Sequence, residues 1–243
     1  MRSKILTAVA GSAVVAGALT TVLVVQADGN EHKSAHSSVI ISHGDQLLPS
    51  DTLTDWTTYG DHLVVVTVTD QRELAPTPEE TAAGEGYIPR VISLRIDKVL
   101  WSRKEAPNAP STFETELDGW QFHGDQRNAV RLDGEPMLEV GKQYVLPILY
   151  FTKTARVQNA GWSTLSPDSI FPYQEGILGK GDVIPSLLQQ TEGGAKPTDA
   201  RGPFFGKESA ELVAALESTP PAPAAADAMR LPPDERAKHA HDQ

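Results

Sequence analysis

The sequence predicts a mainly β fold, and three stretches carry that prediction. Residues 62–69 are rich in β-branched residues and too apolar for a surface strand. Residues 91–100 alternate between apolar and polar side chains, which is the period of a half-buried strand. Residues 143–151 form a long apolar strand. A chain of 243 residues has room for one such domain with a tail at each end.

The N-terminal residues 1–27 are predicted to be a signal peptide or a membrane anchor. Arg2 and Lys4 precede an apolar run over residues 5–25, close to the ~20 residues that span a bilayer. The small residues before Asp28 suit cleavage after Ala27, which leaves both alternatives open. In either case the basic end stays inside, so the rest of the chain is expected to be extracytoplasmic, either secreted or anchored in the cytoplasmic membrane.

Two elements are expected before the first long strand. Residues 28–45 are polar and are predicted to form a flexible spacer, within which residues 39–41 could form a short edge strand. A short helix should follow, with Ser50 or Asp51 as its N-cap and its end near Tyr59.

The central strands follow in order along the chain. After the strand at 62–69, residues 73–87 are predicted to be an acidic loop that contains proline and glycine. Strands are expected at 91–100, 112–120 and 129–132, with a turn at Gly124. Pro147 lies inside the strand at 143–151 and has no N–H to donate, so that strand should be at a sheet edge or carry a bulge.

The pattern weakens after residue 151. We expect a last strand at 161–165, an aromatic turn at 170–173 and a short hairpin at 177–181. The predicted domains are therefore the β-domain over 46–185, a linker with a short helix over 186–217, and a Pro/Ala-rich tail over 218–243 that is too poor in apolar residues to fold.

One family resemblance rests on the order of these signals. The stretches "DHLVVVTV", "VISLRIDKVLW" and "LEVGKQYVLPIL" resemble the netrin/TIMP-like branch of OB-type β-barrels, as found in exported bacterial proteins. The resemblance implies a single OB-like, partly open β-barrel with short flanking helices. Such domains bind proteins, inhibit proteases or act as accessory domains. Because this chain has no cysteine, the metalloprotease inhibition of better-known members is not carried over.

Charge and composition exclude several classes of function. The residues after Ala27 carry all 32 acidic residues and all but two of the 21 basic residues, which gives a net charge of −13. A surface this acidic repels phosphate backbones, so we expect no nucleic-acid partner. The absence of cysteine removes disulfides, thiol nucleophiles and thiolate metal sites.

No motif predicts a reaction or a cofactor. The chain has no Gly-x-Ser-x-Gly elbow and no phosphate-binding loop. The tripeptide His-Gly-Asp occurs at 43–45 and at 123–125, either as metal-binding turns or, the interpretation we favour, as polar turns whose glycine has a positive φ.

Aromatic residues near strand ends are the best binding candidates. An exposed cluster would be a partner surface, whereas buried rings would plug the ends of the barrel, and we favour the second interpretation. The candidates are Trp120, Phe122, Trp162, Phe171 and Tyr173.

Three functional hypotheses follow. The first is an exported or membrane-anchored, non-catalytic β-domain that binds a protein or another cell-envelope component. The second is an extracytoplasmic hydrolase with dispersed catalytic residues, for which His62 or His123 beside an acid would be the place to look. The third is a membrane-tethered spacer, which requires that residues 5–25 be retained. The sequence does not specify an oligomeric state.

Overall fold

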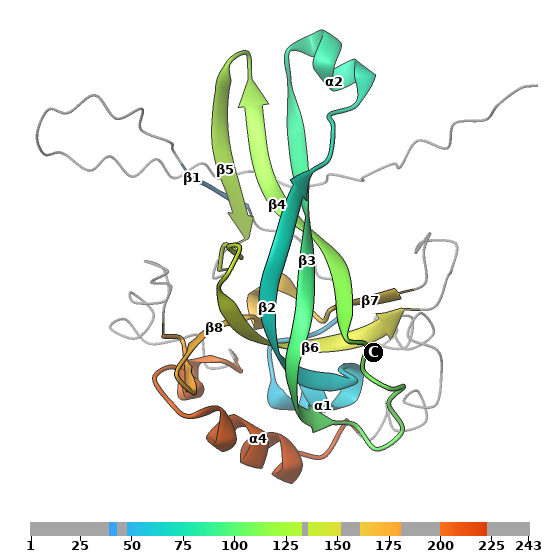
Figure 1. The fold of residues 1–243 in the computed structure, drawn as a ribbon, viewed down its shortest axis with the longest axis vertical. Helices are drawn as coiled ribbons and strands as arrows, with labels where there is room; N and C mark the ends of the chain where they lie inside the picture. Colours follow the sequence, from blue (N-terminus) through green and yellow to red (C-terminus); the bar gives the residue numbers. More distant parts are fainter. Residues whose placement is uncertain (1–38, 43–47, 133–135, 152–160, 181–199, 223–243) are drawn as a thin grey trace, which may run out of the picture.

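A computed structural model of the protein describes residues 39–42, 48–132, 136–151, 161–180 and 200–222 (Figure 1). The predicted signal or anchor at 1–27, most of the spacer at 28–45, the turn at 43–45 and residues 223–243 of the predicted tail lie outside these ranges. Within the described ranges, no helix combines the length and the apolar character needed to cross a membrane.

The structure is mainly β, as predicted, and its strands form one sheet. The sheet order is β1-β5-β4-β3-β2-β6-β8-β9, and β7 also pairs with β6. The β1–β5 pair is parallel and the others are antiparallel. In the described part of the chain β1 and β9 do not pair with each other, so the sheet is open. The strands are β1 (Val39–Ser42), β2 (His62–Glu73), β3 (Glu85–Ser102), β4 (Thr112–His123), β5 (Gln126–Leu132), β6 (Gln143–Phe151), β7 (Gly161–Thr164), β8 (Phe171–Gln174) and β9 (Ile177–Leu178).

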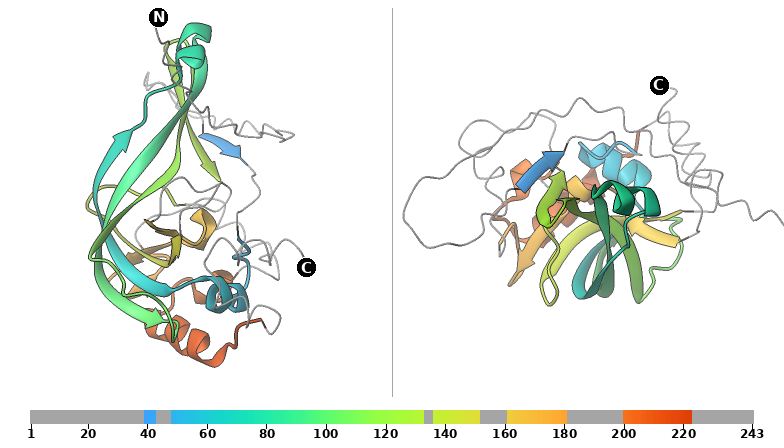
Figure 2. Two further views of the ribbon diagram at one scale, coloured as in Figure 1. Left: turned by 90° about the vertical axis from the view of Figure 1, so that its right-hand side faces the viewer. Right: turned by 90° about the horizontal axis from the view of Figure 1, so that it is seen from above.

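The longest strands of the sheet twist strongly along their length (Figure 2). The β2–β3 register shifts at three places, and the β3–β4 register shifts between Ile88 and Arg90. Irregularities of this kind increase the local twist and bend a strand. Gly119 lies opposite the last one, where a Cβ atom would stand 2.1 Å from the carbonyl oxygen of Ile88. The bend therefore requires glycine at this position.

The first half of β2 is buried on both faces, which explains its unbroken apolar sequence. Leu63 and Val65 belong to one apolar cluster, and Val64 and Val66 belong to a second one. Trp56 of helix α1 (Leu53–Tyr59) packs in the first cluster, together with residues of helix α4 (Ser209–Ser218). The two helices lie together at the same end of the sheet (Figure 1).

Pro147 occupies an interior strand, which corrects the prediction of an edge or a bulge. β6 pairs with β2 along one side and with both β8 and β7 along the other. The pairing with β8 ends at Val145 and the pairing with β7 begins at Ile148. The Pro147 carbonyl accepts a hydrogen bond from the Leu165 N–H, so its backbone polar atoms face this junction. The missing N–H therefore falls between two partner strands, where no ladder bond is lost.

The sequence predicted one of the first two short helices, α1, but not the other, α2. α1 begins one or two residues later than expected, with Thr52 as N-cap in a capping box with Asp55. Helix α2 (Pro78–Ala83) lies inside the predicted acidic loop, with a second capping box between Thr77 and Glu80. Two 3-10 turns, η1 (Pro167–Ser169) and η2 (Gly202–Phe204), complete the helical elements that the structure describes.

The predicted aromatic turn at 170–173 is wrong, because these residues enter strand β8. Phe171 pairs with Val145 of β6, and β8 then turns into β9 through Glu175 and Gly176. Both turn residues have positive φ, at 53° and 87°, as in a two-residue hairpin turn of type I′. The hairpin was predicted at 177–181, but residues 177–178 are instead the second strand of a hairpin with β8, and residue 181 lies outside the described ranges.

Candidate functional site

The five candidate aromatic residues do not form one surface. Phe171 is fully buried, and its ring lies 6.1 Å from Trp56 and 5.2 Å from Phe205, measured between centroids. Phe171 therefore belongs to the core, in agreement with the favoured interpretation that the aromatic candidates are buried. Trp162 packs beside His62 at 5.3 Å and Tyr150 at 5.5 Å.

Trp120 lies on β4, where it pairs with Ile88 of β3 and Ala129 of β5. Strands β3, β4 and β5 form an arm of the sheet that extends beyond the body of the molecule, with α2 at its tip (Figure 1). The guanidinium carbons of Arg90 and Arg127 stand 5.6 and 4.6 Å from the centre of the Trp120 ring. Arg127 also forms an ion pair with Glu73 at 2.9 Å. Phe122, two residues along β4, is half-buried opposite Arg127. These contacts connect the strands of the arm and occupy the Trp120 ring.

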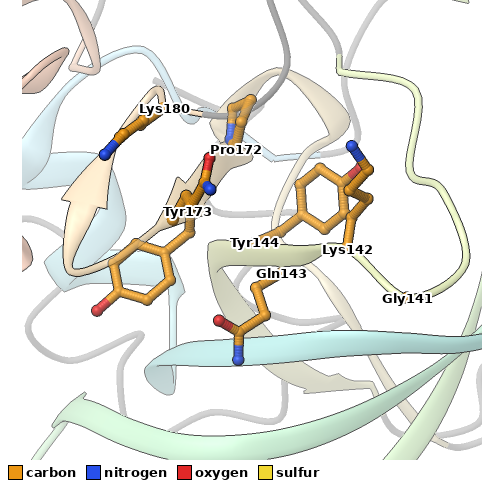
Figure 3. Close-up of a pocket in the computed structure, with 8 residues that line it drawn as sticks. Gly141, Lys142, Gln143, Tyr144, Pro172, Tyr173 and Lys180 are labelled. Carbon is orange, nitrogen blue, oxygen red and sulfur yellow. The ribbon is translucent and has the colours of Figure 1, made fainter.

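Tyr173 lines a cavity. The cavity has a volume of about 240 Å³ and lies where the start of β6 meets β8 (Figure 3). This is smaller than the ~300–1,000 Å³ typical of drug-sized ligands, so it fits one side chain or one small ring. The lining residues are Gly141, Lys142, Gln143, Tyr144, Pro172, Tyr173, Gln174 and Lys180.

Strand pairing positions these side chains. Gln143 pairs with Tyr173 and Tyr144 pairs with Pro172, so successive lining residues face opposite sides of the sheet. Gly141, with φ at 85°, makes the turn into β6 and donates to the Val68 carbonyl.

Tyr144 is buried and its hydroxyl is engaged. It accepts from the Glu139 N–H at 3.0 Å and donates to the Met137 carbonyl at 3.2 Å. Tyr173 is half-buried, and its hydroxyl is 3.4 Å from the Ser209 hydroxyl of α4. The ring of Tyr173 is therefore the aromatic surface that a ligand could contact.

The lining of the cavity contains two basic residues although the chain is strongly acidic. They are Lys142 and Lys180, and the lining includes no carboxylate. Lys180 forms an ion pair with Glu175, which is outside the lining. The hydrogen bond and the positive charge from Lys180 hold the pKa of Glu175 below its usual value. Figure 3 shows the two lysine side chains on opposite sides of Pro172.

A second polar cluster surrounds His62, at the other end of the β2–β6 pair. His62 Nε2 lies 2.7 Å from the Pro107 carbonyl, which can only accept, so Nε2 carries the proton. Nδ1 is then free to accept from the Ser102 hydroxyl at 2.8 Å. Burial lowers the pKa of His62, and the hydrogen bond to Pro107 raises it by a smaller amount. The imidazole is thus held neutral beside an exposed serine.

Neither of the two histidines singled out in the sequence meets an acid inside a cleft. His62 contacts a hydroxyl and a carbonyl, and His123 lies 3.1 Å from Glu85 with both side chains mostly exposed. The Gly124 between His123 and Asp125 has φ at 55°, as expected for a polar turn. Within the described residues, no group of three or more His, Asp or Glu side chains could hold a metal ion.

Comparison with known proteins gives no relative. No protein-family model matches the chain. No curated protein and no solved structure matches it either. The fold and the site geometry are therefore the basis for a functional proposal.

Proposed function

We propose that this protein is an exported or membrane-anchored, non-catalytic β-domain that binds a protein or another cell-envelope component through the cavity between β6 and β8. We also propose that the open sheet is an OB-like, partly open barrel. The strongly twisted long strands and the two apolar clusters on either side of β2 support this barrel class.

The observation that carries the binding proposal is the chemistry of the cavity. Two lysines, two glutamines and Tyr173 line a space of about 240 Å³. A small number of polar groups beside an aromatic side chain is a common composition for a ligand site. Its size suits one residue of a partner rather than a whole drug-sized molecule.

Capture from envelope extracts tests the proposal. Gln174→Trp would fill the cavity from an exposed position, and Asn108→Trp would place the same ring on the exposed β3–β4 loop as a control. We expect the wild type and Asn108→Trp to retain the same component and Gln174→Trp to lose it. Equal capture by all three would exclude the cavity as the binding site.

A hydrolase is the second candidate, and the Ser102–His62 contact favours it. A serine hydroxyl 2.8 Å from a neutral imidazole, itself oriented by the Pro107 carbonyl, is the arrangement of a nucleophile, its base and an orienting group. A fluorophosphonate probe tests it. A hydrolase requires covalent labelling that disappears in Ser102→Ala and His62→Gln but persists in Ser111→Ala; labelling that is absent or independent of Ser102 excludes it.

A further inference from the structure

We infer that the cavity between β6 and β8 recognises a carboxylate side chain of a partner protein, and that Glu175 competes for part of this site. The inference rests on the proposed binding function and specifies the class of ligand. It uses three observations: the two lysines in the lining, the intramolecular pair between Lys180 and Glu175, and the hairpin that presents Glu175.

The first observation concerns charge. The chain carries a net charge of −11, yet the lining of this cavity includes Lys142 and Lys180 and no acid. Both lysines are exposed, so this pair of cations is available to an anionic group. Gln143 and Gln174 add amide groups that can donate to a carboxylate oxygen. Gln143 already donates to Asp97 at 3.0 Å, which leaves Gln174 as the more available donor.

The second observation identifies the kind of anion. Lys180 is already paired with a carboxylate, that of Glu175. The geometry around Lys180 therefore accommodates a glutamate side chain. A partner that presents Glu or Asp would make the same contact, with Lys142 on the other side of Pro172 as the second anchor (Figure 3).

The third observation gives the competition. Glu175 and Gly176 form the tight β8–β9 turn, with φ at 53° and 87°, so the Glu175 backbone is fixed near Lys180. The two side chains are 70% and 47% exposed, and an exposed pair of this kind is weak. An incoming carboxylate can therefore displace Glu175. Because the Lys180–Glu175 pair must break first, the net affinity of the partner is lower than it would be for a free Lys180.

Two labelled peptides test the carboxylate specificity on the full chain. Tetraglutamate and tetraglutamine differ in charge but hardly in shape, and their binding is measured by fluorescence anisotropy at low ionic strength. We expect tetraglutamate to bind and tetraglutamine not to bind. Lys142→Gln and Lys180→Gln should each weaken binding by about three-fold or more, whereas Lys142→Arg and the exposed control Lys104→Gln should not.

A separate variant tests whether Glu175 competes with the ligand for Lys180. Glu175→Gln should tighten tetraglutamate binding by about two- to five-fold, because Lys180 is released. Glu79→Gln makes the same charge change on α2, at the tip of the arm, and should leave the affinity unchanged. Unchanged affinity in Glu175→Gln, or an equal gain in Glu79→Gln, overturns the competition.

Two outcomes would overturn this inference. Equal binding of the two peptides overturns the carboxylate specificity. Stronger binding of an oligomer of galacturonic acid than of tetraglutamate overturns the peptide ligand in favour of an acidic glycan. If either occurs while Gln174→Trp still abolishes capture from envelope extracts, the binding function stands and the ligand class is wrong.

Discussion

Arg103 forms an ion pair with the fully buried carboxylate of Asp61, at 2.5 Å. The other carboxylate oxygen accepts from the Tyr150 N–H at 2.9 Å, and the Arg103 N–H donates to the Asp61 carbonyl. The pair thus joins the start of β2, the end of β3 and β6. It lies beside His62, so it also fixes the position of the second polar cluster.

Removing the cation should strongly destabilise the fold. Arg103→Met leaves the Asp61 carboxylate buried without its charged partner, which typically costs about 3–5 kcal/mol of unfolding free energy. The double variant Asp61→Asn with Arg103→Met should lose less, because no buried charge remains and the amide oxygen can still accept from Tyr150. Urea unfolding measures both. If the single variant is as stable as the double one, the unpaired buried carboxylate is not the cause of the loss.

Gly119 should not tolerate even a methyl group. A Cβ there would stand 2.1 Å from the Ile88 carbonyl oxygen, so the strands at the bend must separate. We expect Gly119→Ala to lose about 1–3 kcal/mol of stability in urea unfolding. Gly161→Ala is the matched control, because its Cβ would meet no atom within 4 Å among the described residues. Equal stability of the two variants would contradict the close approach.

The His62 cluster should make stability depend on pH. Burial lowers the pKa of His62 below its usual value, so the unfolded chain takes up the proton first as the pH falls. The contribution of neutral His62 is complete above a pH of about 6.5 and is lost between that value and the lower pKa of the folded state. Melting temperatures from about pH 8 to about pH 5 should fall, more gently in His62→Gln. His123→Gln, at an exposed position, should keep the wild-type slope.

The sequence anticipates the parts of the fold that depend on local pattern. The β-branched run at 62–69 and the apolar run at 143–151 became β2 and β6, and the strict alternation at 91–100 became the middle of β3. Helix α2 lies where the composition predicted a loop. Its local signal is a capping box between Thr77 and Glu80 with Pro78 in the first turn, which favours a helix more strongly than the surrounding composition favours a loop.

The candidate site depends on contacts that local pattern does not contain. Lys142 and Lys180 line the same cavity because β8 pairs with β6, whereas the sequence suggested a turn at 170–173 instead of that strand. Of the aromatic candidates, Tyr173 reached the cavity, while Phe171, two positions earlier on β8, is buried in the core. Positions two apart on a strand face the same side, so Tyr173 packs against the same apolar cluster as Phe171, but it is only partly buried.

A photo-crosslink from the cavity tests the central claim most directly. The full chain would carry p-benzoylphenylalanine at Gln174, in the lining, or at Asn108, on the exposed loop after β3, and would be irradiated in intact envelopes. We predict one discrete adduct from position 174 and none from position 108. The same adducts from both positions, or none from position 174, would contradict a binding site between β6 and β8.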